Sequence, residues 1–408
     1  MRILLVNKFH YLKGGSETYY FNLKELLEEH GHEVIEFSMK DSRNLPSNYS
    51  EYFVDNVEYN KKNSSYNKIK LAIKLVYSFE ARRKMEKLII DYKPNIAHLN
   101  IFQHQLSPSI LGILKKYNIP IVYTAHDFKM ICPNYKMMLP SGEICEDCKG
   151  GRYYNCLKNK CVKNSSMNSF VDMIEAYTHK ILKSYDRIDK IITPSNFYKK
   201  KFIEFGTSSD KIAYIPNFLD GDKYIIRDSC KDYFIYFGRL SDEKGIKTLI
   251  RAMKDVKGKL KVVGTGPMEK ELKEYTKEQS LDGKIEYLGY KTGDELKRII
   301  QDSRFIVVPS KWYENAPYSI LEAMAMGKPV LGSNMGGIPE LVRNNETGLI
   351  FQTNDYKELT DKINLLLNNE NLIKLYGRNA RNIFDNMYNK ETHYESILHI
   401  YEEQISRR

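Results

Sequence analysis

Short apolar runs alternate with longer amphipathic stretches along the first half of the chain. The stretch from Thr18 to His30 has helical periodicity and is closed by Gly31. Such alternation is typical of βαβ units that build a parallel sheet. The runs predicted to be strands here are RILLV (2–6), EVIEF (33–37), NIAHL (95–99), PIVYT (120–124) and KIITPS (190–195).

The second half of the chain repeats this plan. Its apolar runs are rich in Val, Ile, Tyr or Phe, and most of them end in Gly or Ser. We therefore predict the α/β fold class, with two doubly wound, Rossmann-like domains. The predicted strands of the second half are YFIYFG (233–238), KLKVVG (259–264), KIEYLG (284–289), RFIVVPS (304–310), KPVLGS (328–333) and TGLIF (347–351).

A length of 408 residues also favours two domains over one hydrophobic core. In open parallel sheets, ligands bind beyond the carboxyl ends of the strands, so we expect a site in a cleft where two such domains face each other. The periodicity leaves open whether the last helix packs back on the first domain. The predicted parts are a first domain (1–214) with a Cys-rich insert (132–161), a linker (215–224), a second domain (225–388) and a C-terminal helix (389–408).

The composition is that of a globular protein in water, with 42% hydrophobic and 28% charged residues. No stretch approaches the roughly 18 apolar residues of a membrane span. The first apolar run covers only Ile3 to Val6, which fits a strand better than a signal peptide. We expect a cytoplasmic protein.

The net charge of +11 favours anionic partners, which include nucleic acid, a membrane surface and phosphorylated ligands. From Lys61 to Lys93, ten basic residues stand against three acidic ones, which gives +7. Two interpretations stay open: a basic amphipathic helix on the inner face of an anionic membrane, or a surface helix packed on the sheet. The apolar positions in question are Ile69, Ile73, Leu75 and Val76.

Several strand ends carry polar residues that suit a phosphorylated ligand. Arg239 and Lys244 follow YFIYFG, and together a planar guanidinium and a compact ammonium suit a diphosphate. Gly264 and Gly266 follow the next strand, but Glu269 stands where a third glycine would be. This is a poor dinucleotide fingerprint, which argues against an NAD enzyme.

Two carboxylates flank the start of a predicted helix in KWYENAPYSILEAMAMGKPV. Glu314 lies in the loop, Pro317 is predicted to be the first helical residue, and Glu322 falls on the second turn. Carboxylates placed in this way can accept hydrogen bonds from sugar diols. Further along, Gly336 and Gly337 precede another predicted helix and offer bare backbone N–H donors.

These motifs, taken in order, resemble those of the retaining glycosyltransferases of glycosyltransferase family 4, which have the two-domain GT-B fold. The spacing from Glu314 to Glu322 is similar to the paired-glutamate motif of that family, and NETGLIF (345–351) looks like the strand segment that follows it. The resemblance covers nearly the whole chain and is carried by Arg239, Lys244, Glu314, Glu322, Gly336 and Gly337.

The resemblance implies a role for each donor-side residue. Arg239 and Lys244 would neutralise the leaving diphosphate without a metal cofactor, and Glu322 would hold the ribose hydroxyls. Glu314 would hold the transferred sugar. The remaining donor contacts would come from the backbone of Asn315, Ala316 and Pro317, from Gly336 and Gly337, from Gly264 and Gly266, and from Tyr290 near the base.

On the acceptor side, Gly14 and Gly15 open the helix that holds Glu17, in a loop that lies near the donor phosphate and the acceptor in this family. His126, in YTAHDF, is similar in position to a family histidine that faces the donor sugar. An ordinary turn and a structural histidine are the alternatives. Asn100 and His104 are weaker candidates for acceptor contact.

Five of the six cysteines fall in the insert. Their spacing is compatible with a tetrahedral structural zinc site, and in a cytoplasmic protein such clustering favours metal over disulfides. Reduced thiols without metal are the alternative. The expected ligands are Cys145, Cys148, Cys156 and Cys161, with Cys132 as a competing ligand.

Taken together, we expect a retaining transfer from a nucleotide-sugar donor, with UDP favoured, to a glycan or lipid-linked acceptor of cell-surface polysaccharide. A nucleotide-sugar epimerase and a non-catalytic nucleotide-sugar-binding subunit are the alternatives. A nucleic-acid-binding protein fits less well, because no binding motif accompanies the basic residues.

Overall fold

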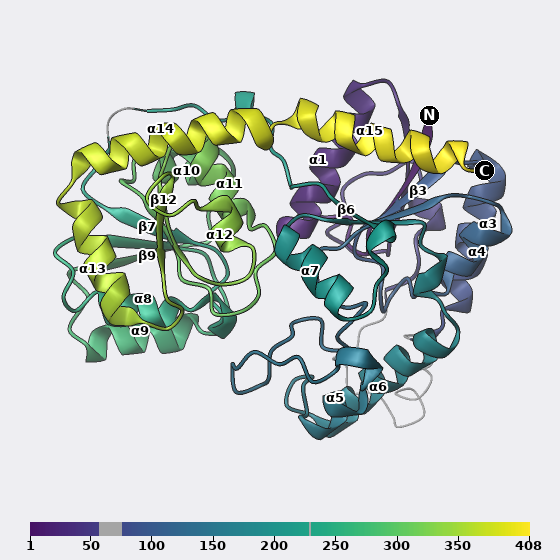
Figure 1. Cartoon of the computed structure of the whole chain (residues 1–408), viewed down its shortest axis with the longest axis horizontal. Coiled ribbons are helices and arrows are strands. Elements are labelled where there is room, and N and C mark those ends of the chain that lie inside the picture. Colours follow the sequence, from purple (N-terminus) through teal and green to yellow (C-terminus); the bar gives the residue numbers. More distant parts are fainter. Residues whose placement is uncertain (57–75, 228–229) are drawn as a thin grey trace. The chain divides into compact units, whose positions relative to one another are not determined.

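The computed structural model describes residues 1–56, 76–227 and 230–408 (Figure 1). The chain forms two compact units. Unit 1 comprises Met1–Ile215 together with Tyr394–Arg408, and unit 2 comprises Pro216–His393.

Unit 1 is built on a six-stranded parallel sheet in the order β2-β1-β3-β4-β5-β6. Nearly every residue of its first four strands is buried, as expected of parallel strands that helices cover on both faces. The strands are β1 (Arg2–Val6), β2 (Glu33–Phe37), β3 (Ile96–Leu99), β4 (Ile121–Thr124), β5 (Lys190–Thr193) and β6 (Ile212–Tyr214). The helices are α1 (Gly15–Glu29), α3 (Phe79–Tyr92), α4 (Ile110–Lys116), α5 (Tyr154–Lys158), α6 (Ser166–Ile181), α7 (Asn196–Glu204) and most of α15 (Lys390–Ser406).

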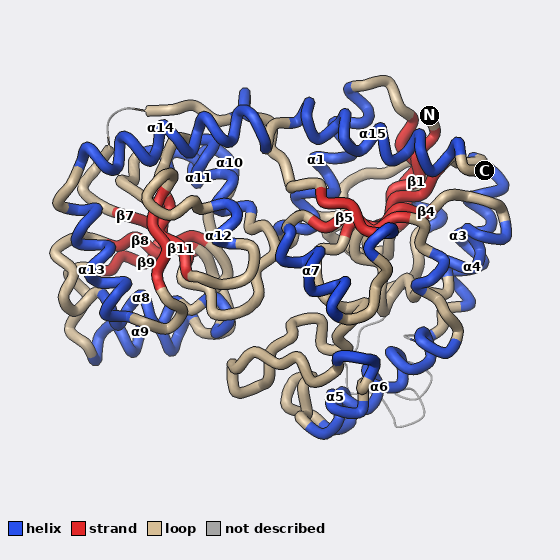
Figure 2. Tube along the Cα trace, in the orientation of Figure 1, coloured by secondary structure: helices blue, strands red, loops and turns tan. Residues whose placement is uncertain are grey.

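Unit 2 contains a second six-stranded parallel sheet, in the order β12-β11-β10-β7-β8-β9 (Figure 2). Its strands are β7 (Phe234–Phe237), β8 (Leu260–Val263), β9 (Ile285–Gly289), β10 (Ile306–Val308), β11 (Val330–Ser333) and β12 (Gly348–Phe351). Its helices are α8 (Ile246–Ala252), α9 (Glu269–Glu278), α10 (Gly293–Gln301), α11 (Tyr318–Ala325), α12 (Ile338–Leu341), α13 (Tyr356–Leu367) and α14 (Glu370–Met387).

Each sheet has one point at which the strand order reverses. In unit 1 the chain proceeds outward in opposite directions from the neighbours β1 and β3, and in unit 2 from the neighbours β7 and β10. The loops that leave two such strands diverge and open a crevice beyond the carboxyl ends of the strands. These two reversal points are therefore where we expect each unit to bind a ligand.

The predicted fold class is confirmed, and all eleven predicted strands are present. The analysis missed β6, a three-residue edge strand whose sequence is too short for a periodicity to show. The prediction for Pro317 was wrong by one residue. It is the N-cap of α11, with φ −65° and ψ 128°, and the helix begins at Tyr318.

The end of the chain packs against the sheet of unit 1 through buried polar contacts. The hydroxyl of Tyr401 lies 2.6 Å from Nδ1 of His98, and Nε2 of His98 lies 2.7 Å from the hydroxyl of Thr124. All three side chains are buried. Nearer the start of α15, Tyr394 stacks on His30 at 3.6 Å between ring centroids.

Within the described parts of the chain, no helix combines the length and the apolar character that crossing a bilayer requires. The basic segment from Lys61 was predicted as a membrane or surface helix. Most of it, including Ile69, Ile73 and Leu75, lies outside the described residues. Its described end forms α3, which Ser78 caps by accepting the backbone N–H of Ala81.

Tyr401→Phe should destabilise the protein by about 1–3 kcal/mol, because the change keeps the ring but leaves Nδ1 of buried His98 without its partner. Tyr394→Phe is the matched control. It removes a similar bond to His32 at a half-exposed position where water can replace it, so the loss should be within about 0.5 kcal/mol. Urea unfolding of the three proteins measures both values, and equal losses would contradict the prediction.

Candidate functional site

The reversal point of unit 2 carries an ion pair between the loops that follow β7 and β10. Lys244 Nζ lies 2.7 Å from Glu314 Oε1, and the hydroxyl of Ser310 donates to the same oxygen at 2.6 Å. The Glu314 side chain is only 7% exposed, so the pair is shielded from bulk water on the carboxylate side. Lys244 also lies over the ring of Trp312, 5.2 Å from its centroid. Two residues predicted for donor binding are thus brought into direct contact.

Glycines hold the backbone of this loop in place. Gly336 has φ +62°, and a Cβ there would lie 2.3 Å from the carbonyl oxygen of Glu314 and 2.5 Å from its nitrogen. The N–H of Gly337 donates to the same carbonyl at 2.8 Å. Gly245, with φ +67°, packs against the Pro309 carbonyl in the same manner. The glycine pair therefore fixes the position from which the carboxylate of Glu314 projects.

Arg239 lies in the loop after β7, and its side chain is exposed. Its carbonyl accepts a hydrogen bond from the hydroxyl of Tyr236 at 2.8 Å. Gly264 and Gly266 pack closely on this loop, where a Cβ would meet the carbonyls of Gly238 and Leu240 at 1.9 and 2.2 Å. The structure gives these two glycines a packing reason, and their contact with a donor stays a prediction.

Glu322 occupies a different electrostatic setting on α11. Burial raises the pKa of its carboxyl to about 7, and nearby Lys297 opposes that shift. None of the residues that the structure describes donates a hydrogen bond or forms an ion pair to this carboxylate. A carboxylate without partners in a low-dielectric site gains stability when donors arrive. Glu322 is therefore prepared for a ligand that brings hydroxyl or N–H groups.

The other residues predicted for donor binding lie in the loop before α11 and at the end of β9. Ala316 is buried, and its carbonyl accepts the Asn217 side-chain amide at 3.0 Å, so that carbonyl is already used. Asn315 is half-buried in the same loop, and Pro317 has no N–H to offer. At the end of β9, Tyr290 is 68% exposed, which leaves its ring face open.

The reversal point of unit 1 brings Asn100 and His126 together. Nε2 of His126 lies 2.9 Å from the side-chain oxygen of Asn100, which can only accept. Burial lowers the pKa of His126 to about 3, so the ring is neutral, with its proton on Nε2 and a free lone pair on Nδ1. The buried side-chain nitrogen of Asn100 has no partner among the described residues. Both side chains thus retain hydrogen-bonding capacity for a ligand.

The first helix of unit 1 begins at Gly15, with Gly14 as its N-cap. Glu17, in its first turn, is 2% exposed, and burial raises the pKa of its carboxyl. The hydroxyl of Ser16 donates to it at 3.0 Å. In the preceding loop, burial lowers the pKa of Lys8 to about 8. The sequence analysis missed Lys8, since a lysine beside a strand gives no signal of its burial.

His104 belongs to a second cluster. Its Nδ1 lies 3.5 Å from Glu175, which accepts Lys129 Nζ at 2.8 Å, and Asp172 accepts the same ammonium at 3.2 Å. Among the described residues, His104, Asp172 and Glu175 form the one group of three metal-ligating side chains whose ligand atoms lie within 4.8 Å of one another. The ammonium of Lys129 already supplies the positive charge there. This cluster is an internal ion-pair network that the sequence analysis missed.

Comparison with protein families covers both units. Residues 13–223, just over half of the chain, match the profile of Glycosyltransferase Family 4, and residues 225–383 match that of Glycosyl transferases group 1.

Individual relatives agree with these matches. The chain is 27% identical over 366 residues to an uncharacterized 42.6 kDa protein in the cps region of Klebsiella pneumoniae, which covers 84% of this chain and 88% of that protein. It is 25% identical over 206 residues to the putative colanic acid biosynthesis glycosyltransferase WcaL of Escherichia coli, covering 47% of this chain and 51% of that one.

Solved structures share the fold. Sucrose-phosphate synthase from Thermosynechococcus elongatus superimposes with a TM-score of 0.76 at 19% identity, covering 100% of both chains. Anabaena Alr3699/HepE, in complex with UDP and glucose, gives a TM-score of 0.69 at 17% identity and covers 99% of this chain and 100% of that one. These similarities show that the chain has the same fold as these two proteins.

Gly336→Ala should be destabilising by more than about 1–2 kcal/mol, since it adds left-handed backbone strain to a clash with the Glu314 backbone. Gly283→Ala is the matched control in the same unit, because its Cβ would meet open space. That change should be neutral or stabilise by up to about 1 kcal/mol. Denaturant midpoints compare the two variants, and a Gly336→Ala protein as stable as wild type would contradict the assigned packing.

Proposed function

The chain belongs to glycosyltransferase family 4, and on this premise we propose that it transfers a sugar from a nucleoside diphosphate donor with retention of anomeric configuration. UDP-sugar is the favoured donor. The favoured acceptor is a glycan or a lipid-linked glycan in the biosynthesis of a cell-surface polysaccharide. The colanic acid glycosyltransferase among its relatives supports the polysaccharide, and the UDP complex of HepE supports the nucleotide.

The observation that carries the proposal is the charge arrangement at the reversal point of unit 2. Lys244 donates one of its three ammonium N–H groups to Glu314, so two remain for diphosphate oxygens. Arg239, on the same loop and exposed, adds a planar fork that matches phosphate geometry. Two such cations can stabilise the charge that develops on the departing diphosphate, which is commonly the largest catalytic contribution. Transfer on this scheme is independent of a metal ion.

The two glutamates then take different tasks. Glu314 is bound by Lys244 and Ser310, so it can orient hydroxyls of the transferred sugar. Glu322 lacks partners and can accept both ribose hydroxyls. We assign Glu314 to binding and not to nucleophilic attack, because Lys244 and Ser310 both bind its Oε1 and hold the carboxylate in place. The acceptor hydroxyl then attacks from the face that the diphosphate leaves.

In unit 1, His126 is assigned to the donor sugar. Its neutral ring can accept a sugar hydroxyl at Nδ1 while Asn100 fixes the ring through Nε2. Glu17, Asn100 and His104 remain the candidates for acceptor contact, with His104 held within the Lys129 network.

Glu322→Gln should weaken UDP binding in a pH-dependent manner. The wild-type carboxyl is protonated below its pKa of about 7 and then resembles the amide, whereas above it the carboxylate accepts two charge-assisted hydrogen bonds. At about one pH unit above the pKa the loss should be about 10–100-fold, and it should shrink as the pH falls below the pKa.

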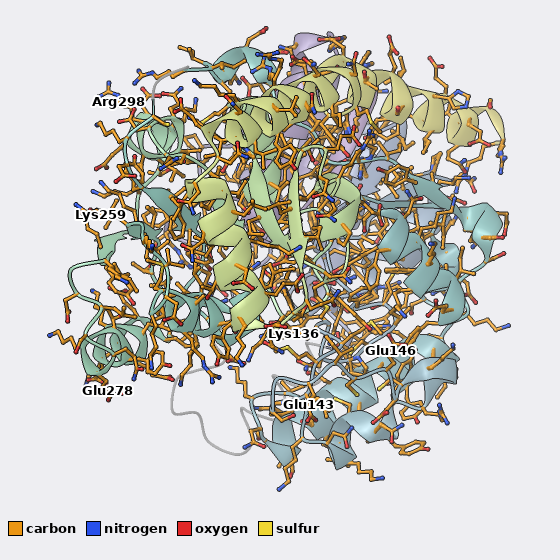
Figure 3. All side chains as sticks on the ribbon, turned by 60° about the vertical axis from the view of Figure 1, so that its left-hand side comes forward. Lys136, Glu143, Glu146, Lys259, Glu278 and Arg298 are labelled. Atoms are coloured by element: carbon orange, nitrogen blue, oxygen red, sulfur yellow. The ribbon has the colours of Figure 1, made fainter. Side chains whose placement is uncertain are left out.

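Calorimetry across this pH range measures the affinity of wild type and of Glu322→Gln for UDP. The protonation of UDP itself affects both affinities equally, so it cancels in their ratio. Exposed Glu278→Gln, at the end of α9, is the control and should bind as wild type does (Figure 3). A constant ratio near one at every pH would refute the assignment of Glu322.

Arg239→Ala and Lys244→Ala should lower kcat of sugar transfer by about 10²–10³-fold, with a smaller effect on the affinity for the intact donor, because negative charge grows on the diphosphate as it leaves. Lys247→Ala removes a cation of the neighbouring helix that pairs with exposed Glu271, so its kcat should be unchanged. The donor for these assays is identified first, by measuring the rate at which the enzyme hydrolyses each of a panel of nucleotide sugars. Unchanged kcat in both test variants would rule out this mechanism.

A further inference from the structure

The segment between β4 and α6 contains five of the six cysteines, and no part of the proposed transfer uses them. Residues 128–165 are all described, and their regular structure consists of the short helix α5 and one 3₁₀ turn. All five cysteines are free thiols. Regular secondary structure therefore contributes little to holding this segment in one conformation.

The side chains of the five cysteines line one cavity. Its volume of about 10 Å³ is close to that of a single small sphere, and the five cysteines lie in its wall. Cys132, Cys148 and Cys156 are buried, and the other two are half-buried. A cavity of this size, lined by so many thiols, suits one ion and is too small for an organic ligand.

Contacts within the cluster link all five thiols, and Cys156 interacts with both Cys161 and Cys132. The thiol of Cys148 interacts electrostatically with those of Cys132, Cys145 and Cys161. Cys132 also receives backbone N–H groups from Asn134 and Met137, and Cys145 receives the N–H of Asp147. Such N–H donors stabilise a thiolate over a thiol.

The spacing of four of these thiols is symmetrical: twelve residues separate Cys132 from Cys145, two separate Cys145 from Cys148, and twelve separate Cys148 from Cys161. On this spacing Cys132 replaces Cys156 in the ligand set expected from the sequence, and Cys156, hydrogen-bonded to Cys161, is the extra thiol.

Backbone strain points in the same direction. Of the thirteen non-glycine residues with positive φ in the described chain, five lie in this segment: Tyr135, Met137, Lys160, Lys163 and Asn164. Such conformations cost about 1–3 kcal/mol each and persist only where the surroundings enforce them. The segment also contacts the rest of unit 1 through the ion pairs of Lys129 with Asp172 and Glu175, and through the pair between Lys201 of α7 and Glu146 at 2.8 Å.

We propose that this segment binds one structural zinc ion through the thiolates of Cys132, Cys145, Cys148 and Cys161. Four thiols release their protons to solvent as the ion binds, and no redox change is involved. Zn–S bonds of about 2.3 Å place tetrahedral ligands about 3.8 Å apart. No three of the sulfurs yet lie mutually within 4.8 Å in the described structure, so the ion draws them together. All four positions are filled by protein, so the site is closed and stabilises the segment without taking part in transfer.

The test uses the full chain purified under reducing conditions. Metal analysis should give one zinc per chain, and replacement by Co²⁺ should give the intense visible absorption of a tetrahedral thiolate site. Serine variants at each of the four proposed ligands should lose the bound zinc. Cys156→Ser should retain it, and so should the control Cys230→Ser, which changes the exposed sixth cysteine.

A second measurement keeps the test independent of variants that fold poorly. A strong zinc chelator should speed tryptic cleavage after exposed Lys158, Lys160 and Lys163 in the wild-type chain, while cleavage elsewhere stays unchanged. The proposal is overturned by a chain that stays metal-free when zinc is supplied, or by intact-mass analysis that shows disulfides among these cysteines. Loss of zinc from Cys156→Ser with retention by Cys132→Ser would overturn this ligand set.

Discussion

The contact between Lys244 and Glu314 is the constraint on which the proposed donor site depends. It joins the loops after β7 and β10, which the sheet order places side by side at its reversal point. Opposite charges at 2.7 Å with one partner nearly buried stabilise each other, and an unpaired charge there would be costly. Because Gly336 and Gly337 clamp the Glu314 backbone from a third loop, the pair is fixed before any ligand arrives.

Both units combine bonded and unbonded polar groups in their candidate sites. At each reversal point some polar groups are fully bonded and serve as supports, while others are left with unused capacity. In unit 2 Ser310 and one donor of Lys244 support Glu314, and the groups left for a ligand are Glu322 and the other two donors of Lys244. In unit 1 His126 is oriented by Asn100, whose own amide nitrogen lacks a partner. Buried groups of this kind cost stability in the empty protein, which is typical of binding sites.

Much of the fold follows from the sequence, because apolar runs and glycine-rich turns carry a local signal. All eleven predicted strands were recognisable as short apolar runs that alternate with amphipathic stretches or end in Gly, Pro or Ser. The order of polar residues at strand ends was also visible, so Arg239, Glu314 and Glu322 could be singled out before their positions were known. The edge strand β6 was too short to show.

What could not be predicted depends on distance and burial. The pair between Lys244 and Glu314 joins residues 70 apart in sequence, and only the strand order brings them together. The depressed pKa of Lys8 and the ion pairs of Lys129 arise from packing against remote elements. Similarly, Gly264 and Gly266 suggested close approach to a ligand, whereas the structure shows close approach to the neighbouring loop. A glycine pattern reports that something comes near the backbone, but it does not report what.

The most direct measurement is a crystal structure of the full chain in complex with UDP. The account predicts that both ribose hydroxyls lie within hydrogen-bonding distance of the Glu322 carboxylate, and that the diphosphate contacts the side chains of Arg239 and Lys244. A nucleotide bound elsewhere, or bound here with its ribose turned away from Glu322 and its phosphates toward solvent, would contradict the account.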